Sequence, residues 1–167
     1  NLSPLARQLL DLAEMAITGS LTDEAGSCWA SKWEGCDLTK LQPYQGRLRW
    51  YGKDWGPYAH AMVGHKRLRN VRAAIESVIA DGVEGDFAEL GVGRGGVCIF
   101  AKLCLDAYGQ PARRVHAFDV FGDLPAYGAG KARRNFLSVS EEQVRHNFEK
   151  YGLTLDDSIV FHKGLFQ

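Results

Sequence analysis

The chain has 167 residues, of which 46% are hydrophobic and 24% are charged, close to the average of globular domains. Its 20 basic and 20 acidic residues cancel, so no overall field would draw it to nucleic acid or anionic lipid. No run approaches the roughly 20 apolar residues of a membrane span. Cys98 and Cys104 lie in an apolar stretch, as small core residues do in a reducing compartment. We therefore expect a cytoplasmic protein that binds neither nucleic acid nor membrane.

Residues 1–57 predict one helix followed by an irregular arm. Ser3 and Pro4 are typical of a helix start, and apolar residues then recur at helical spacing until Gly19. Over residues 20–57 this periodicity fails, while Trp and Tyr accumulate. So much aromatic surface must pack against something. We expect the arm to pack against the core domain or against a partner subunit of a homo-oligomer, and a lid over substrate is the alternative.

Residues 58–167 alternate between helical and strand patterns. Helices are predicted over 58–81, over 97–108 and from Ser140 onward, and strands over 86–90, 114–119 and 158–162. Strands that alternate with helices are typical of a doubly wound parallel sheet, the Rossmann-like α/β class. Because only three strands are predicted, we expect this chain to hold the first half of such a sheet and to be incomplete.

The most informative segment, residues 89–96, reads E-L-G-V-G-R-G-G between a strand and a helix. Glycines allow a sharp turn and close approach to a ligand, and the helix start offers unpaired N–H groups. A dinucleotide is disfavoured, because Glu89 would repel its diphosphate and Asp119 lies 28 residues after Gly91 instead of about 20. S-adenosylmethionine carries a sulfonium and no phosphate. The pattern therefore favours this methyl donor, with Glu89 near its methionine portion and Asp119 accepting hydrogen bonds from its ribose.

Several blocks together resemble the macrocin O-methyltransferase family of natural-product tailoring enzymes. The matching blocks are P-Y-A-H-A-M-V-G at 57–64, residues 86–96, D-V-F-G-D-L-P at 119–125, residues 138–148 and K-G-L-F at 163–166. The resemblance implies a class I methyltransferase fold and S-adenosylmethionine as cofactor. It also implies that the acceptor is a hydroxyl of a small secondary metabolite, on a sugar or an aromatic ring, and that magnesium assists.

Carried over position by position, the resemblance places a set of residues around the cofactor. They are Ala61, Met62, Glu89, Leu90, Gly91, Val92, Gly93, Gly95, Asp119, Val120, Phe121, Ser140, Gly164, Leu165 and Phe166. At four of these positions the family usually has another residue: Thr at Ala61, Trp at Gly93, Ser at Val120 and Trp at Leu165. The two lost hydroxyls, at Ala61 and Val120, are expected to weaken cofactor binding.

Catalytic and metal-binding groups are not evident. The family's D-G-D-x-Y and D-D-Y motifs, which supply its metal ligands and base, do not occur here, so magnesium would need ligands outside this chain. His60, in a block that borders the cofactor, and Glu24, in the arm, are the candidates for a catalytic contact. Two alternatives stay open. One is a non-catalytic cofactor-binding or assembly fragment of a larger protein, which the missing motifs favour. The other is an NAD-dependent oxidoreductase, which Glu89 and Asp119 disfavour.

Overall fold

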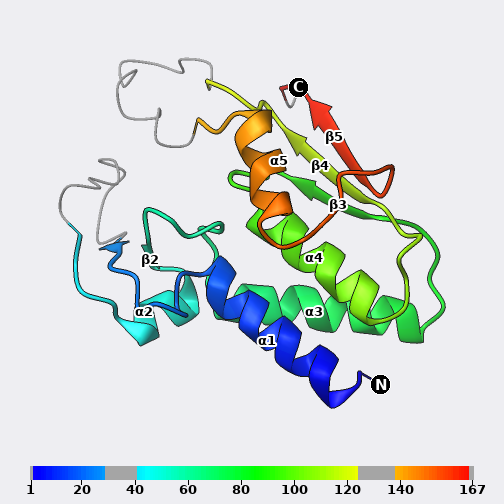
Figure 1. Cartoon of the computed structure of the whole chain (residues 1–167), viewed down its shortest axis with the longest axis horizontal. Helices are drawn as coiled ribbons and strands as arrows, with labels where there is room; N and C mark the ends of the chain where they lie inside the picture. Colours follow the sequence, from blue (N-terminus) through cyan, green and yellow to red (C-terminus); the bar gives the residue numbers. More distant parts are fainter. Residues whose placement is uncertain (1, 29–40, 124–137, 166–167) are drawn as a thin grey trace.

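The computed structural model describes residues 2–28, 41–123 and 138–165 (Figure 1). Its main sheet is parallel, in the order β3-β4-β5, with β3 at Phe87–Leu90, β4 at Val115–Asp119 and β5 at Ile159–Lys163. Glu89 pairs with Ala117 in register, and Ala117 pairs with Phe161. All three strands lie where the sequence predicts them. The predicted α/β class, with the first half of a Rossmann-like sheet, is confirmed.

The core lies between this sheet and helix α4 (Gly96–Ala107), which follows β3 directly. Cys98 and Cys104 are fully buried there, as predicted. Helix α5 (Glu141–Glu149) lies on the same face, where Phe148 contacts Phe161 of β5. Ser140 accepts a hydrogen bond from the backbone N–H of Gln143, so it caps α5 as its sequence suggests.

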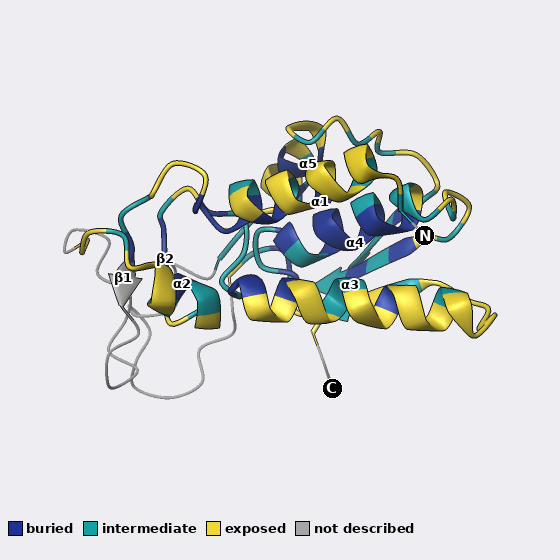
Figure 2. Cartoon of the chain, turned by 90° about the horizontal axis from the view of Figure 1, so that it is seen from below, coloured by how far each residue is buried: buried dark blue, intermediate teal, exposed yellow. Residues whose placement is uncertain are grey.

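Helices α1 (Pro4–Ile17) and α3 (His65–Ala80) both pack against α4, which lies between them in Figure 2. Figure 2 shows α4 buried along most of its length, while the outward faces of α1 and α3 are exposed. Leu10 and Ile17 of α1 belong to the same core as the sheet. The first helix is therefore part of the main hydrophobic core. No helix in the described part of the chain is long and apolar enough to cross a membrane.

The arm holds more regular structure than the sequence indicates. Helix α2 (Gly46–Tyr51) precedes β2 (Asp54–Trp55), which pairs antiparallel with β1 (Ser27–Cys28). A buried ion pair between Arg49 and Asp54, 2.9 Å apart, links α2 to β2. Both partners belong to the arm. Residues 29–40, which include Trp29 and Trp33, lie outside the described part of the chain.

One boundary differs clearly from its prediction. The helix expected from residue 58 begins only at His65, because residues 57–64 are held in a non-helical path. The backbone N–H groups of His60 and Ala61 donate to the carbonyl of Ile17, at 2.9 and 3.3 Å. These hydrogen bonds place the segment between the end of α1 and the start of α4, where it borders the site described next.

Candidate functional site

The loop between β3 and α4 depends on its glycines. Gly91, Gly93 and Gly95 all have positive φ, at 89°, 55° and 89°. Residues other than glycine rarely adopt a positive φ, because their Cβ then crowds the backbone. The loop therefore turns tightly enough to bring the N-terminus of α4 to the carboxyl end of the sheet, where ligands bind in open α/β sheets.

The carboxylate of Asp119, at the end of β4, organises this loop. Its Oδ2 accepts hydrogen bonds from the backbone N–H groups of Val92 and Gly93, at 2.7 and 3.0 Å. Its Oδ1 accepts one from the N–H of Val120 at 2.7 Å. A fourth, longer contact comes from the N–H of Phe121 at 3.4 Å, so backbone donors face all of the roughly four lone-pair sites of the carboxylate. The expected acceptance of ribose hydroxyls stays a prediction, but a role in holding the loop is visible in the geometry.

The segment before α3 lies directly on the glycine loop. The N–H of Gly96 donates to the carbonyl of His60 at 2.9 Å. A Cβ built on Gly96 would lie 2.5 Å from that carbonyl oxygen, so only glycine allows this approach. The guanidinium of Arg94 donates to the carbonyls of Pro57 and Ala59 and lies over the ring of Trp55, 4.5 Å from its centroid. Arg94 thus joins the loop to the arm.

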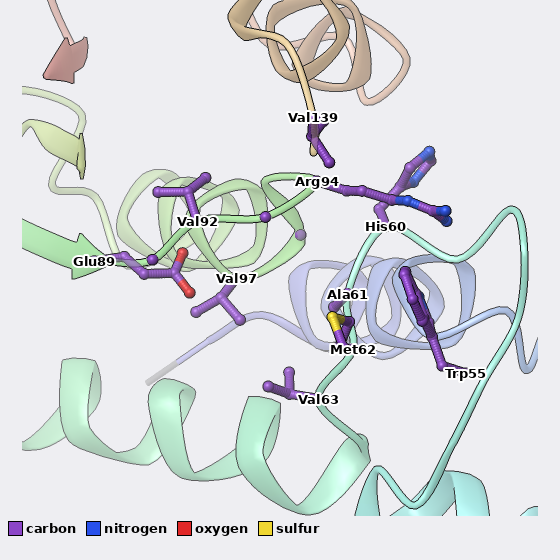
Figure 3. Close-up of a pocket in the computed structure, with 13 residues that line it drawn as sticks. Trp55, His60, Ala61, Met62, Val63, Glu89, Val92, Arg94, Val97 and Val139 are labelled. Carbon is purple, nitrogen blue, oxygen red and sulfur yellow. The ribbon is translucent and has the colours of Figure 1, made fainter. Parts of the chain in front are cut away.

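These contacts enclose a cavity of about 100 Å³, the first cavity, shown in Figure 3. The sequence-predicted residues that line it are Ala61, Met62, Glu89, Gly91, Val92 and Gly93, together with His60. Figure 3 shows Glu89 at one end and Trp55, with Ala61 and Met62, towards the other. Most other walls are apolar. The volume is below the roughly 300 Å³ of a complete small-molecule site, so this cavity would hold only part of a cofactor.

Glu89 is the acidic group of the first cavity. Its pKa is raised to about 7, mainly by burial and also by the nearby charge of Asp119, although a hydrogen bond from the Cys98 thiol at 3.0 Å opposes the shift. At neutral pH the carboxyl is therefore close to half protonated. A cationic ligand beside it would stabilise the charged form.

The other predicted cofactor residues in the described part of the chain do not line the first cavity. Leu90 and Leu165 are 70% and 52% exposed, and Phe166 lies outside the described residues. Phe121 is buried and contacts Phe161, and the N–H of Gly164 donates to the carbonyl of Asp119 at 3.0 Å. Ser140 lines a neighbouring cavity. Gly95 is the last residue of the glycine loop before α4, and the N–H of Val120 donates to Asp119, whose carboxylate holds that loop.

The structure gives both catalytic candidates a definite environment. Nδ1 of His60 lies 2.7 Å from the hydroxyl of Tyr151. Burial lowers the pKa of His60 to about 4, with help from the charges of Lys150 and Arg94. It is therefore neutral at physiological pH and a weak base. Glu24 accepts a hydrogen bond from the backbone N–H of Tyr58 and so holds the arm in place. A catalytic role for either residue stays a prediction.

Several lining residues were not found from the sequence. They are Trp55, Val63, Arg94, Gly96, Val97 and Val139. Arg94 and Gly96 sit inside the glycine motif and could have been included on that ground. Trp55 and Val139 have no local signal, since they reach the cavity only through tertiary packing. For a metal, the described ranges 2–28, 41–123 and 138–165 contain no group of three His, Cys, Asp or Glu side chains that could hold one.

Comparison with known proteins agrees with this geometry. The family model described as Macrocin-O-methyltransferase (TylF) matches residues 27–167. A Streptomyces olivaceus protein, 8-demethyl-8-(2,3-dimethoxy-alpha-L-rhamnosyl)-tetracenomycin-C 4'-O-methyltransferase, is 46% identical over 129 residues, which are 71% of this chain and 49% of the relative. Demethyldecarbamoylnovobiocin O-methyltransferase of Streptomyces niveus is 40% identical over 74% of this chain and 51% of its own length.

The solved structure of the O-methyltransferase NovP superposes with a TM-score of 0.79 at 33% identity, covering 95% of this chain and 64% of that one. This chain therefore spans about half the length of the two Streptomyces relatives, and less than two thirds of NovP. The family match covers most of the described sheet, loop and helices. The chain belongs to the macrocin O-methyltransferase family.

Proposed function

We propose that this chain is part of an S-adenosylmethionine-dependent O-methyltransferase that acts on a hydroxyl of a small natural product, on a sugar or an aromatic ring. The observation that carries the proposal is the first cavity. It joins Glu89 and the glycine loop to Ala61 and Met62, two blocks distant in sequence that were both expected at the methyl donor. The relatives are named as methyltransferases of rhamnosyl-tetracenomycin, a novobiocin precursor and mycinamicin III.

S-adenosylmethionine would supply an electrophilic methyl group on a positively charged sulfur. Glu89, in its ionised form, would hold the cationic methionine end, because an opposite charge favours the carboxylate. The loop glycines would let the backbone approach the cofactor closely. Asp119 would keep the loop in this shape through the N–H groups of Val92 and Gly93. The contribution of these residues is to bind and orient the donor, which is a large part of bimolecular catalysis.

Activation of the acceptor is not assigned to the described residues. They form no metal site, so no step is given to magnesium, and its ligands would have to come from elsewhere. His60 has too low a pKa to be an effective base near neutral pH. The cytoplasmic location, the homo-oligomer and the division of the chain at residue 57 also remain predictions.

The test is isothermal titration with S-adenosylhomocysteine and, separately, with NADH. We expect S-adenosylhomocysteine to bind and NADH not to bind. Glu89→Gln should weaken S-adenosylhomocysteine by about tenfold, since a charge-assisted hydrogen bond is worth about 1.5–3 kcal/mol. Glu76→Gln, on the exposed face of α3, is the matched control and should bind like the original chain. Preferential binding of NADH, or equal affinity of the two variants, would contradict the proposal.

A further inference from the structure

Cys98 is a buried residue that contacts the carboxyl group of the first cavity. It is the third residue of α4, which begins at Gly96, and its side chain is fully buried. Its thiol donates a hydrogen bond to Oε2 of Glu89 at 3.0 Å. The sequence predicts only a small core residue at position 98. The structure adds a polar contact with the residue that is expected to meet the methyl donor.

Cys98 offers two hydrogen-bond donors to Glu89. The first N–H groups of a helix have no partner within that helix, and the backbone N–H of Cys98 acts on the Glu89 carboxyl together with the thiol. Burial raises the pKa of Glu89, both donors of Cys98 lower it, and the charge of Asp119 raises it. Cys98 therefore offsets part of the cost of burying an ionised carboxylate at this position.

The thiol of Cys98 keeps its proton at physiological pH. Burial raises its pKa well above the ordinary value, and the charges of Glu89 and Asp119 act in the same direction. A cysteine must lose its proton to act as a nucleophile, so this thiol serves as a hydrogen-bond donor instead. A hydrogen bond in such a buried place is electrostatically stronger than the same bond in water.

The contact also fixes the direction of the Glu89 side chain. Figure 3 shows its carboxylate facing the inside of the first cavity, near Val97 at the start of α4. A free glutamate side chain would lose rotamer freedom when it meets a ligand, and this loss opposes binding. A carboxylate has about four lone-pair sites, so two donors on Cys98 leave sites for a ligand. Cys98 thus orients Glu89 without filling it.

We infer that Cys98 is a positioning residue of the donor site, and that it holds the Glu89 carboxylate in the direction where it meets the cationic end of the methyl donor. The assignment of that ligand rests on the proposed function. The contact between the two residues does not, because it can be tested in the chain without ligand.

The first experiment measures the pKa of Glu89 by carbon-13 NMR of the side-chain carboxyls, with Glu89→Gln to assign the signal. Cys98→Ala should raise this pKa above about 7, because a donor to the charged form is lost. Cys98→Val, which also lacks a donor but fills the space, should act in the same direction. Cys98→Ser keeps a donor and should restore the original pKa.

Cys104→Ala is the matched control for this measurement. Cys104 lies in the same helix and is as fully buried as Cys98, so its replacement by alanine removes the same atoms from the core. The pKa of Glu89 should not change in this variant. An unchanged pKa in Cys98→Ala and Cys98→Val, or an equal rise in Cys104→Ala, would overturn the inference.

The second experiment titrates S-adenosylhomocysteine into the same variants at pH 7. Cys98→Ala should bind it about threefold to tenfold more weakly, as expected for the loss of one hydrogen bond. Cys98→Ser should recover most of this loss, and Cys104→Ala should bind like the original chain. In the Glu89→Gln background, Cys98→Ala should have little further effect, because the two residues act through one contact.

The titration separates the positioning role from the proposed function. If the original chain and Cys98→Ala bind S-adenosylhomocysteine equally well, the positioning role is overturned and the proposed function stands. If the original chain does not bind S-adenosylhomocysteine, the proposed function is overturned, and with it the role of Cys98 in donor binding.

Discussion

The first cavity and the neighbouring second cavity differ in polarity, although they share one wall. The first is mainly apolar and holds a single carboxyl group, Glu89, which burial drives towards its neutral form. The second cavity, of about 510 Å³, is mainly polar and is also lined by Lys150 and Ser140. His60 and Arg94 line both. The comparison shows that two cavities with common lining residues can still differ in polarity, because the side chains that only one of them contacts are different.

The largest expected effect comes from removing the close approach on which both cavities depend. Gly96→Ala places a Cβ 2.5 Å from the carbonyl of His60 and 2.8 Å from the Cβ of Ala61. We expect a loss of about 2–3 kcal/mol in the free energy of unfolding, as is usual for overpacking, measured by urea denaturation. S-adenosylhomocysteine should also bind more weakly. Gly46→Ala, whose Cβ would find only ordinary contacts at 3.6 Å or more, serves as control. Equal stability of the two variants would mean that His60 and Ala61 can move away from residue 96 at little cost in free energy.

The next prediction tests whether burial raises the pKa of Glu89 and so favours its protonated form. Its pKa is about 7 in the folded chain and 4.5 for an unperturbed group, so the folded state binds the extra proton. The stability of the original chain should therefore fall as pH rises from about 4.5 to 7. Glu89→Gln removes this loss and should be more stable by about 3 kcal/mol at pH 8, with little difference at pH 4.5. Urea denaturation at several pH values measures it. Parallel profiles for Glu89→Gln and Glu76→Gln would refute a buried, protonated carboxyl.

A smaller effect is expected from removing the contact between Tyr151 and His60, a residue that lines both cavities. Tyr151→Phe removes the hydroxyl that lies 2.7 Å from Nδ1 of His60. The loss of one half-buried hydrogen bond should cost about 1 kcal/mol of stability. Thermal denaturation gives the value, and Tyr51→Phe is the control, because Tyr51 is exposed and the described contacts of its ring do not involve the hydroxyl. A Tyr151→Phe variant as stable as Tyr51→Phe would show that His60 does not need this partner.

The smallest effect concerns the electrostatic interaction between Lys150 and His60. Lys150→Met should raise the pKa of His60 from about 4, because the charge of Lys150 helps to lower it. Stability should change by less than about 0.5 kcal/mol, since Lys150 lies on the surface. NMR titration of the His60 ring protons measures the pKa, with Lys53→Met as control. An unchanged pKa would indicate that burial alone keeps His60 neutral.

The parts that the sequence could predict are those with local signals. Alternating strand and helix patterns located β3, β4 and β5, and the glycine motif located the turn that brings Glu89 to the cavity. The motif also suggested the importance of Asp119, whose carboxylate now proves to hold the loop backbone. These features depend on residues that are close together in the sequence, so they could be predicted without knowledge of tertiary contacts.

The features that the sequence did not predict depend on contacts between segments that are distant along the chain. The helix predicted from residue 58 starts at His65 because Ile17 accepts hydrogen bonds from His60 and Ala61, more than 40 residues away in sequence. Trp55 reaches the cavity through the pairing of β1 with β2 and the stacking of Arg94. Lys150 joins the second cavity through Asn147. Local periodicity carries no information on such pairs.

The path that runs from the carbonyl of Ile17 to the N–H groups of His60 and Ala61, and from the carbonyl of His60 to the N–H of Gly96, uses main-chain atoms alone. Main-chain hydrogen bonds survive most substitutions of the side chains that project from them. The shape of the shared wall should therefore persist when the side chains that project from it, such as those of His60 and Ala61, are exchanged. A scaffold of this kind lets evolution change what a site recognises without first having to rebuild the site.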